Sequence, residues 1–301
     1  MKTRSIVLPP RSKARQVYTI NVSGGRSSGY MLRCILDGHG GKLPDHAIAI
    51  FANTGKEYPQ TLDFVRNIKQ EWNVPITWVE YHYDKHARGV KGYPKHTYRI
   101  VQHSFASRNG EPFEQMIDVS RLLPNVVTRK CTSMLKLKPI EQHARFVFQV
   151  MRKDIVNVIG MRADEKKRIA KLVKQRCGEV LTPLWYEGVD LDEVNSFWKS
   201  NYFDLDLPYE GRHSNCDLCF MKGVSKRVAN IKEDQSVADW WIRQETKQLK
   251  LTKGRLRNKS MARFSSRHSY RELLDLSNQQ ELGLNVLQEP EPEDSCFFCG
   301  D

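Results

Sequence analysis

The chain has 301 residues, is 40% hydrophobic and carries a formal net charge of +13. This length suits one large domain, or one domain with a smaller appendage. The sequence has no apolar run near the roughly 20 residues of a membrane span and no signal-peptide core at its start, so we expect a cytoplasmic protein with no membrane partner.

Strand-like and helix-like segments alternate through the first two thirds of the chain. Buried strands are predicted at 17–22, 47–51, 76–81 and 155–159. Helices are predicted at 30–36, 59–69, 140–151 and 189–201. Residues 82–125 look irregular and polar, which is typical of a substrate loop or lid. The alternation predicts an α/β fold with a doubly wound, mainly parallel sheet.

The remaining sequence divides by charge. We expect an α/β nucleotide-binding domain with a cysteine site at 1–228, a basic helical extension at 229–288, and an acidic linker with a Cys-x-x-Cys tail at 289–301. Residues 243–271 carry ten Lys and Arg against one acid, and residues 1–15 are also basic. This pattern favours binding of DNA or RNA by 243–271, although a solvated helix face would look the same.

Aromatic side chains stand within this basic segment or just before it: Trp240, Trp241, Phe264 and Tyr270. They would suit stacking on bases, although such residues more often belong to a core.

A Ser/Gly turn follows the first predicted strand and precedes a helix. Its residues are Ser23, Gly24, Gly25, Arg26, Ser27 and Ser28. Glycines let the backbone approach a ligand, and the helix N-terminus favours phosphate, so the turn predicts an anion cradle. It is not a Walker loop, because no Gly-Lys-Ser/Thr ends it. A second turn, 53–57, follows the second strand, and we expect both turns to share one pocket at the carboxyl edge of the sheet.

The seven cysteines are an odd number, which argues against a disulfide framework. Two Cys-x-x-Cys pairs, Cys216/Cys219 and Cys296/Cys299, have the spacing of a shared metal site. Cys131 follows two cations that favour its thiolate form. Zinc and an iron–sulfur cluster both suit such ligands, while two idle thiols at the C-terminus are the alternative.

Taken in order, these motifs resemble the phosphoadenosine phosphosulfate reductase family, within the PP-loop ATP pyrophosphatases (adenine nucleotide alpha-hydrolase-like superfamily). The resemblance covers about residues 17–226. Six stretches carry the resemblance, and each is similar to a motif of the family. They are 23–28 (the PP-loop), Asn53-Thr54-Gly55-x-Glu57, Cys131 with Lys136 and Pro139, Gly160-x-Arg162-x-x-Glu165-x-x-Arg168, Pro183-Leu184-Trp185, and Cys216-x-x-Cys219.

The resemblance implies roles for these residues. Asn53, Thr54, Gly55 and Gly160 would join the first turn in binding the nucleotide, and Lys136, Arg162 and Arg168 would clamp phosphates. Ser27 stands where the pyrophosphatases carry an aspartate, so Mg²⁺ would need another ligand such as Glu57. The chain looks like a relative of the DNA-phosphorothioation type or one on a mobile element. Because reductases acting on adenosine phosphosulfate and DNA-phosphorothioation relatives bind a [4Fe–4S] cluster, the resemblance implies such a cluster on Cys131, Cys216 and Cys219, with Cys299 or Cys296 as the fourth ligand. Zinc is the alternative.

Three functions follow from the resemblance. The first is cleavage of ATP with Mg²⁺ to pyrophosphate, coupled to sulfur transfer or nucleic-acid modification and served by a sulfur or electron donor protein. The second is a sulfonucleotide reductase, although the tail Phe298-Cys299-Gly300-Asp301 departs from the family's Glu-Cys-Gly-Leu-His motif. The third is a non-catalytic nucleotide-binding adaptor that binds nucleic acid.

Overall fold

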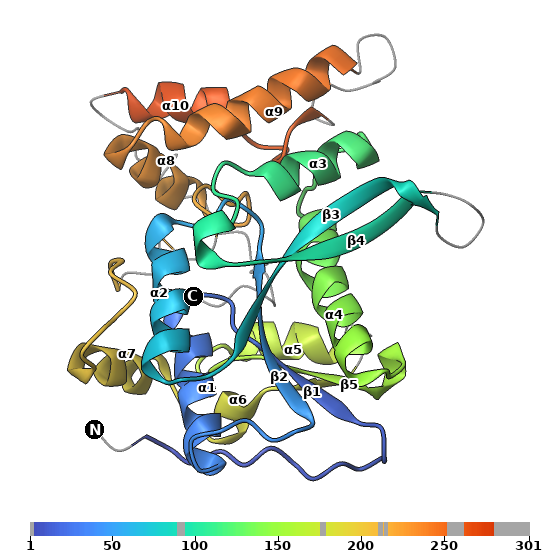
Figure 1. Cartoon of the computed structure of the whole chain (residues 1–301). Coiled ribbons are helices and arrows are strands. Elements are labelled where there is room, and N and C mark those ends of the chain that lie inside the picture. The colour runs from blue at the N-terminus through green and yellow to red at the C-terminus, as the bar shows by residue number, and fades with distance from the viewer. Residues whose placement is uncertain are drawn as a thin grey trace.

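The sheet at the centre of the molecule is mostly parallel. The computed structural model describes residues 3–88, 94–174, 179–209, 213, 216–251 and 262–279. The strands are β1 (Val17–Asn21), β2 (Ala47–Asn53), β3 (Ile76–Arg88), β4 (Pro94–Val101), β5 (Ile155–Val158) and β6 (Glu179–Leu181). Their order is β4-β3-β2-β1-β5-β6, and β4 alone runs antiparallel to its neighbour (Figure 1). This confirms the expected α/β class and its mainly parallel sheet.

Helices cover both faces of the sheet because successive strand residues point to opposite sides. In β2, Ala49 and Phe51 belong to the core formed with α1 (Arg26–Gly38), α2 (Pro59–Glu71) and α7 (Leu191–Ser200). The alternate residues Ile50 and Ala52 pack with Ile140 of α4 (Lys138–Phe148) on the other face.

The remaining helical segments connect these layers. They are η2 (His103–Phe105), α3 (Glu111–Ser120), the π-helical η3 (Thr132–Leu137), η4 (Arg152–Asp154), α5 (Lys166–Lys174) and α6 (Pro183–Tyr186). No helix in the described ranges is long and apolar enough to cross a bilayer.

The direction of the chain through the sheet reverses at β1. This strand pairs with β2 on one side, where Ile20 lies opposite Ala49, and with β5 on the other, where Ile20 lies opposite Val158. In open α/β sheets, the crevice beyond the carboxyl ends at such a reversal is where ligands bind. The residues after β1 and after β5 therefore meet at the favoured position for a site.

A helical layer lies beyond the carboxyl edge of the sheet (Figure 1). It consists of α8 (Val224–Glu233), α9 (Val237–Leu251) and α10 (Tyr270–Ser277), and it shares one hydrophobic core with α3 and the Cys216 turn. The four aromatic residues of the basic extension belong to this core, since each is at most 5% exposed: Trp240, Trp241, Phe264 and Tyr270. Their ring faces are thus unavailable for base stacking.

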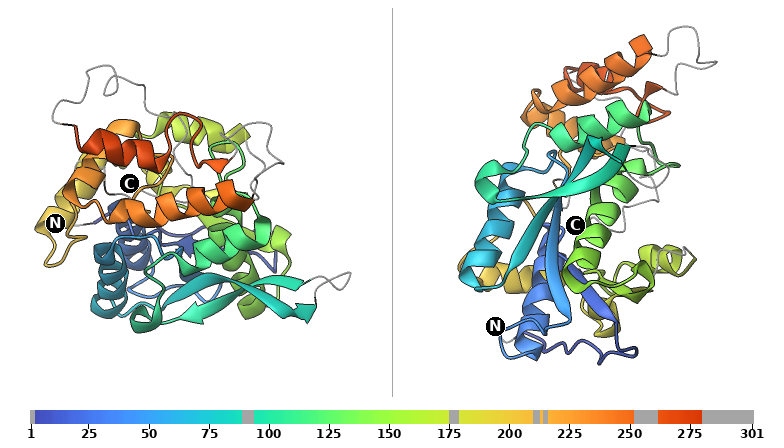
Figure 2. Two further views of the ribbon diagram at one scale, coloured as in Figure 1. Left: turned by 90° about the horizontal axis from the view of Figure 1, so that it is seen from above. Right: turned by 45° about the vertical axis from the view of Figure 1, so that its right-hand side comes forward.

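The prediction of an irregular polar segment at 82–125 is wrong. Strand β3 continues to Arg88 and pairs with β4 as an antiparallel ribbon, which extends beyond the other strands (Figure 2). Tyr81 is buried while His82 and Tyr83 are half-buried, so the ribbon alternates only weakly in polarity. A strand that is polar on both faces lacks the alternating pattern by which strands are recognised in sequence.

Candidate functional site

The first turn, 23–28, is packed tightly at the carboxyl end of β1. The Ser28 hydroxyl accepts a hydrogen bond from the Ser23 amide at 3.0 Å and donates to the Gly25 carbonyl at 2.8 Å. Gly24 has a φ of +86°, and a Cβ there would lie 2.4 Å from Thr61 Cγ2 of α2. Only glycine fits this position, so the turn closes directly on α2.

The segment after β5 meets the first turn, as the chain reversal at β1 requires. A Cβ on Gly160 would lie 3.0 Å from both Ser27 O and Ser28 Cα. Arg162, which is 4% exposed, donates from Nη1 to Ser27 Oγ at 2.8 Å. Arg168 pairs with Glu165 in the same segment. The structure thus brings together the two stretches of the sequence that were expected to bind phosphate.

Arg26 has a different position from the other turn residues. Its guanidinium forms two hydrogen bonds with the Asp204 carboxylate, at 2.8 and 2.6 Å, and lies 3.7 Å from the centre of the Tyr209 ring. The side chain is therefore engaged with the 204–209 segment. Arg26 thus anchors the turn to this segment.

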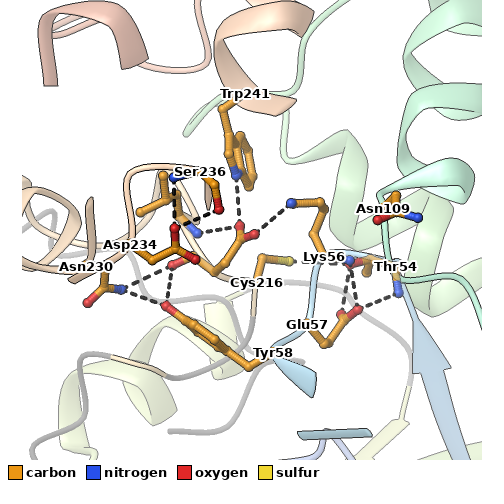
Figure 3. A network of polar contacts seen from close by, with 12 residues as sticks. Thr54, Lys56, Glu57, Tyr58, Asn109, Cys216, Asn230, Asp234, Ser236 and Trp241 are labelled. Atoms are coloured by element: carbon orange, nitrogen blue, oxygen red, sulfur yellow. Dashed lines mark hydrogen bonds and ion pairs between the residues drawn. The ribbon is translucent and has the colours of Figure 1, made fainter. Parts of the chain in front are cut away.

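The second turn, 53–57, is held by its own side chains and by a buried carboxylate. Asn53 Nδ2 donates to Glu80 Oε1 at 2.7 Å, and Asn53 Oδ1 accepts from the Gly55 amide at 3.0 Å. The two Glu57 oxygens accept from the Thr54 amide at 2.9 Å and from the Thr54 hydroxyl at 2.8 Å (Figure 3). The carboxylate expected to bind Mg²⁺ is thus bonded to its own turn.

Three of the predicted metal ligands gather beside this second turn. Cys131, Cys216 and Cys219 line one cavity of about 30 Å³, together with Thr54 and Lys136. Cys216 Sγ lies 3.5 Å from Thr54 Oγ1 (Figure 3). Lys136 is 7% exposed and lines the cysteine cavity. Cys296 and Cys299 lie outside the described residues.

The electrostatics of this cavity favour a neutral thiol in the absence of a metal. Burial raises the pKa of the Cys216 thiol well above its usual range, and the Glu57 carboxylate adds to this rise. Lys136 and the Thr54 hydroxyl act in the opposite direction. A metal ion would have to displace the thiol proton.

The donor set suits a thiolate-bound group, because thiolates are the ligands of zinc and of iron–sulfur clusters. In the described part of the chain, no three His, Cys, Asp or Glu side chains are grouped closely enough to hold one ion. A cavity of about 30 Å³ holds about two waters, on the order of 15 Å³ each. The three thiols would therefore have to separate to surround a cluster.

Asp217, between the two cysteines of the pair, was not singled out by sequence. Its Oδ2 forms an ion pair with Lys56 Nζ at 2.7 Å, and its Oδ1 accepts from Trp241 Nε1 at 2.8 Å. Its carbonyl accepts from the Tyr58 hydroxyl at 3.0 Å. Asp217 thus joins the second turn, the cysteine turn and α9, and neither periodicity nor motif spacing marks it in the sequence.

The basic segment 243–271 is partly neutralised by neighbouring acids. Lys247 pairs with Glu114 at 3.2 Å and with Asp118 at 2.6 Å, both on α3. Further ion pairs join Arg243 to Glu114 and Arg263 to Glu272. Residues 252–261, which include four of the ten cations, lie outside the described ranges.

Fold and site together define an α/β protein with a glycine turn at the reversal of its sheet and a three-cysteine cavity beside the second turn. No family model matches the chain. It is similar to an "Uncharacterized nin region protein ORF290" of Escherichia phage lambda, with 27% identity over 222 residues. The match covers 73% of this chain and 71% of the phage protein.

Proposed function

We propose that this protein is a PP-loop adenine-nucleotide enzyme that cleaves ATP with Mg²⁺ to activate an acceptor, in sulfur transfer or nucleic-acid modification. One observation carries the proposal: Gly160 and Arg162 close onto the 23–28 turn where the sheet order reverses. Two independent sequence motifs meet there, in the crevice that ligands of such sheets occupy.

The proposed chemistry is attack of the acceptor on the α-phosphate, which breaks the bond to the β-phosphate and releases pyrophosphate. Negative charge grows on the leaving group, so fixed amide donors at the start of α1 would stabilise it. Arg162 is almost buried and contacts Ser27 of the turn, and Arg168 is almost buried in the same segment. To bind phosphate oxygens, the two guanidinium groups would exchange their carboxylate partners, Asp164 and Glu165, for the ligand.

The cysteine cavity would hold a [4Fe–4S] cluster on Cys131, Cys216 and Cys219, with Cys296 or Cys299 as the fourth ligand. When bound, the cluster would supply electrons or sulfur for the activated acceptor. The chain's own contribution is the placement of Thr54, from the second turn, 3.5 Å from Cys216. This contact would set the two sites side by side.

The reaction test uses anaerobically purified full-length protein with ATP, Mg²⁺ and reductant, with and without oligonucleotide acceptors. We expect pyrophosphate release, and we expect Arg162→Ala to lower it at least tenfold because a buried phosphate donor is lost. Arg152→Ala, an exposed cation of η4, is the matched control. Sulfite from phosphoadenosine phosphosulfate without pyrophosphate from ATP would instead support a reductase.

The metal test measures iron, sulfide and zinc in the same preparation. We expect about four irons per chain for a [4Fe–4S] cluster, with a brown colour that Cys131→Ser removes. Cys34→Ser changes a buried cysteine outside the cavity and should leave the iron content intact. Full iron in Cys131→Ser would refute this ligand assignment.

A further inference from the structure

A large groove lies away from both turns and from the cysteine cavity. It has a volume of about 410 Å³ and runs between the C-terminal half of α2, the start of β3 and the residues that follow β4. Its lining residues are Arg66, Lys69, Gln70, Trp78, Val101, Gln102, His103 and Ser104. None of them lines the cysteine cavity. The volume is that of a small-molecule or nucleotide pocket.

The groove is positively charged. Arg66 and Lys69 stand on α2, and none of the described lining residues is acidic. Asp63, on the same helix, pairs with Arg66 at 2.9 Å and with His103 at 2.8 Å. Arg108 adds a further cation, because its Nη1 donates to the His103 carbonyl at 3.1 Å. Two permanent cations thus line the groove, a third contacts its wall, and Asp63 is the carboxylate paired with Arg66 and His103, a balance that favours an anionic ligand.

Two aromatic rings, those of Trp78 and His103, line the groove, and a third follows it in the chain. Phe105, directly after the lining residue Ser104, is 77% exposed. The His103 ring packs edge-on against Trp78 with 5.7 Å between ring centres, so its orientation is fixed. The exposed phenyl ring of Phe105 is open to a stacking partner. A cationic groove with an adjacent ring is the combination by which proteins bind single-stranded nucleic acid.

The segment after the groove leads directly to the second turn. Ser107 donates from its amide to Glu80 Oε1 at 2.7 Å, and this same oxygen accepts from Asn53. Gly110 donates from its amide to the Gly55 carbonyl at 2.8 Å. Residues 103–110 therefore extend from the wall of the groove to the turn that we place at the nucleotide site.

We propose that this groove binds a single strand of DNA or RNA, with its phosphates on Arg66 and Lys69 and a base stacked on Phe105. In the proposed function, this nucleic-acid strand would be the acceptor that is modified. The inference rests on the proposed function for the acceptor role alone, while binding of the strand is argued from the groove itself. Next to the groove in the chain stands an exposed ring, Phe105, which 243–271 lacks among its described residues, where the aromatic side chains are buried.

Binding is tested on the full-length chain by fluorescence anisotropy with a labelled single-stranded DNA of mixed sequence, across a salt series. The double variant Arg66→Gln/Lys69→Gln removes two phosphate contacts, so the slope of log K against log salt should fall by about 1.4. Arg152→Gln/Lys153→Gln removes the same charge from exposed residues outside the groove and should leave the slope of the wild type.

The stacking contact is tested separately. Phe105→Ala should weaken binding on the order of tenfold, since one base loses its stacking partner. Phe146→Ala removes another exposed phenyl ring, 67% exposed on α4, and should bind as the wild type does. Because both rings are exposed, neither change should alter the melting temperature.

The outcomes separate this inference from the proposed function. If both groove variants bind the single strand as tightly as the wild type does, the groove is not the binding site and the inference is wrong. Tighter binding of a duplex than of the single strand would also contradict the inference. If the wild type binds no oligonucleotide yet releases pyrophosphate from ATP, the groove inference fails while the proposed function stands. A preference between DNA and RNA single strands, with loss in both groove variants, supports the inference and identifies the ligand.

Discussion

The two turns at the carboxyl edge of the sheet look similar in sequence but depend on different parts of the molecule. The first, 23–28, is held by the α/β core, through the Arg26–Asp204 ion pair and through close packing against Gly160. The second, 53–57, is held from the helical side, because Lys56 pairs with Asp217 of the cysteine turn. Cys216 pairs in addition with Glu57 as an isolated β-bridge.

This difference implies that the second turn, the cysteine turn and the helical layer form one structural unit. Trp241 of α9 and Lys56 of the second turn both contact the Asp217 carboxylate. The Tyr270 hydroxyl donates to the Leu218 carbonyl from α10. A nucleotide that touched both turns would therefore depend on two separately stabilised regions, and each can be perturbed alone.

The largest effect is expected at Asp217. The change Asp217→Ala leaves Lys56 buried without this carboxylate and leaves Trp241 Nε1 without its acceptor. Loss of one partner of a buried pair typically costs about 3–5 kcal/mol. We expect that loss in urea unfolding, together with a fall in the iron content of the proposed cluster, because Asp217 fixes the Cys216–Cys219 turn.

A double-mutant cycle sharpens this test. Lys56→Met should cost less than Asp217→Ala, because Asp217 keeps its hydrogen bonds from Trp241 and Leu218. The combined variant should be less destabilised than the sum of the two. Asp45→Asn, at an exposed position, should change nothing. Additive losses would show that the Lys56–Asp217 pair does not join the second turn to the cysteine turn.

The next largest effect is a pH dependence of the folding stability, which arises from one carboxyl group in the helical layer. Glu245 of α9 is 4% exposed and accepts hydrogen bonds from the amides of Phe264, at 3.1 Å, and Tyr270, at 2.9 Å. Burial raises the pKa of this carboxyl from 4.5 to about 7. The folded state therefore holds the proton more tightly than the unfolded state does.

The sign of the effect follows from linkage. The contribution of Glu245 is fully present below pH 4.5 and is lost as the pH rises through about 7, with a total of about 3 kcal/mol. Glu245→Gln keeps an acceptor oxygen but cannot ionise, so it should match the wild type near pH 5 and exceed its stability near pH 8. Parallel stability profiles across this range would contradict the assigned burial.

The sequence predicted where both turns lie, but not the contact that holds the second one. Strands β1 and β2 are largely apolar, so their residues alone are enough to place both turns at the carboxyl edge of the sheet. The convergence of Cys131, Cys216 and Cys219 on one cavity was also expected, from the family resemblance. The Lys56–Asp217 pair was not, because a contact across 161 positions of the chain leaves no local pattern.

The ribbon of β3 and β4 and the groove beside it were missed for a related reason. Sequence reasoning detects apolar periodicity, and the polar outer half of β3 shows little of it. The aromatic residues of 229–280 were correctly weighed as core candidates, and the structure buries them. Counting charges along the sequence could not predict that Lys247 pairs with Glu114 and Asp118, because these two acids lie on a helix far away in sequence.

The smallest effect is expected at Gly160 and concerns the first turn alone. In Gly160→Ala the new Cβ would lie 3.0 Å from Ser27 O, so the turn must shift by a few tenths of an ångström, at a cost of about 1–2 kcal/mol. We expect weaker ATP binding in calorimetry but normal iron content, since the second turn is held separately. Gly41→Ala is the matched control, because its φ of +85° brings strain while a Cβ there meets nothing within 4 Å. It should lose stability and keep its ATP affinity. If Gly160→Ala lost iron as readily as Asp217→Ala, the two turns would belong to one unit rather than two.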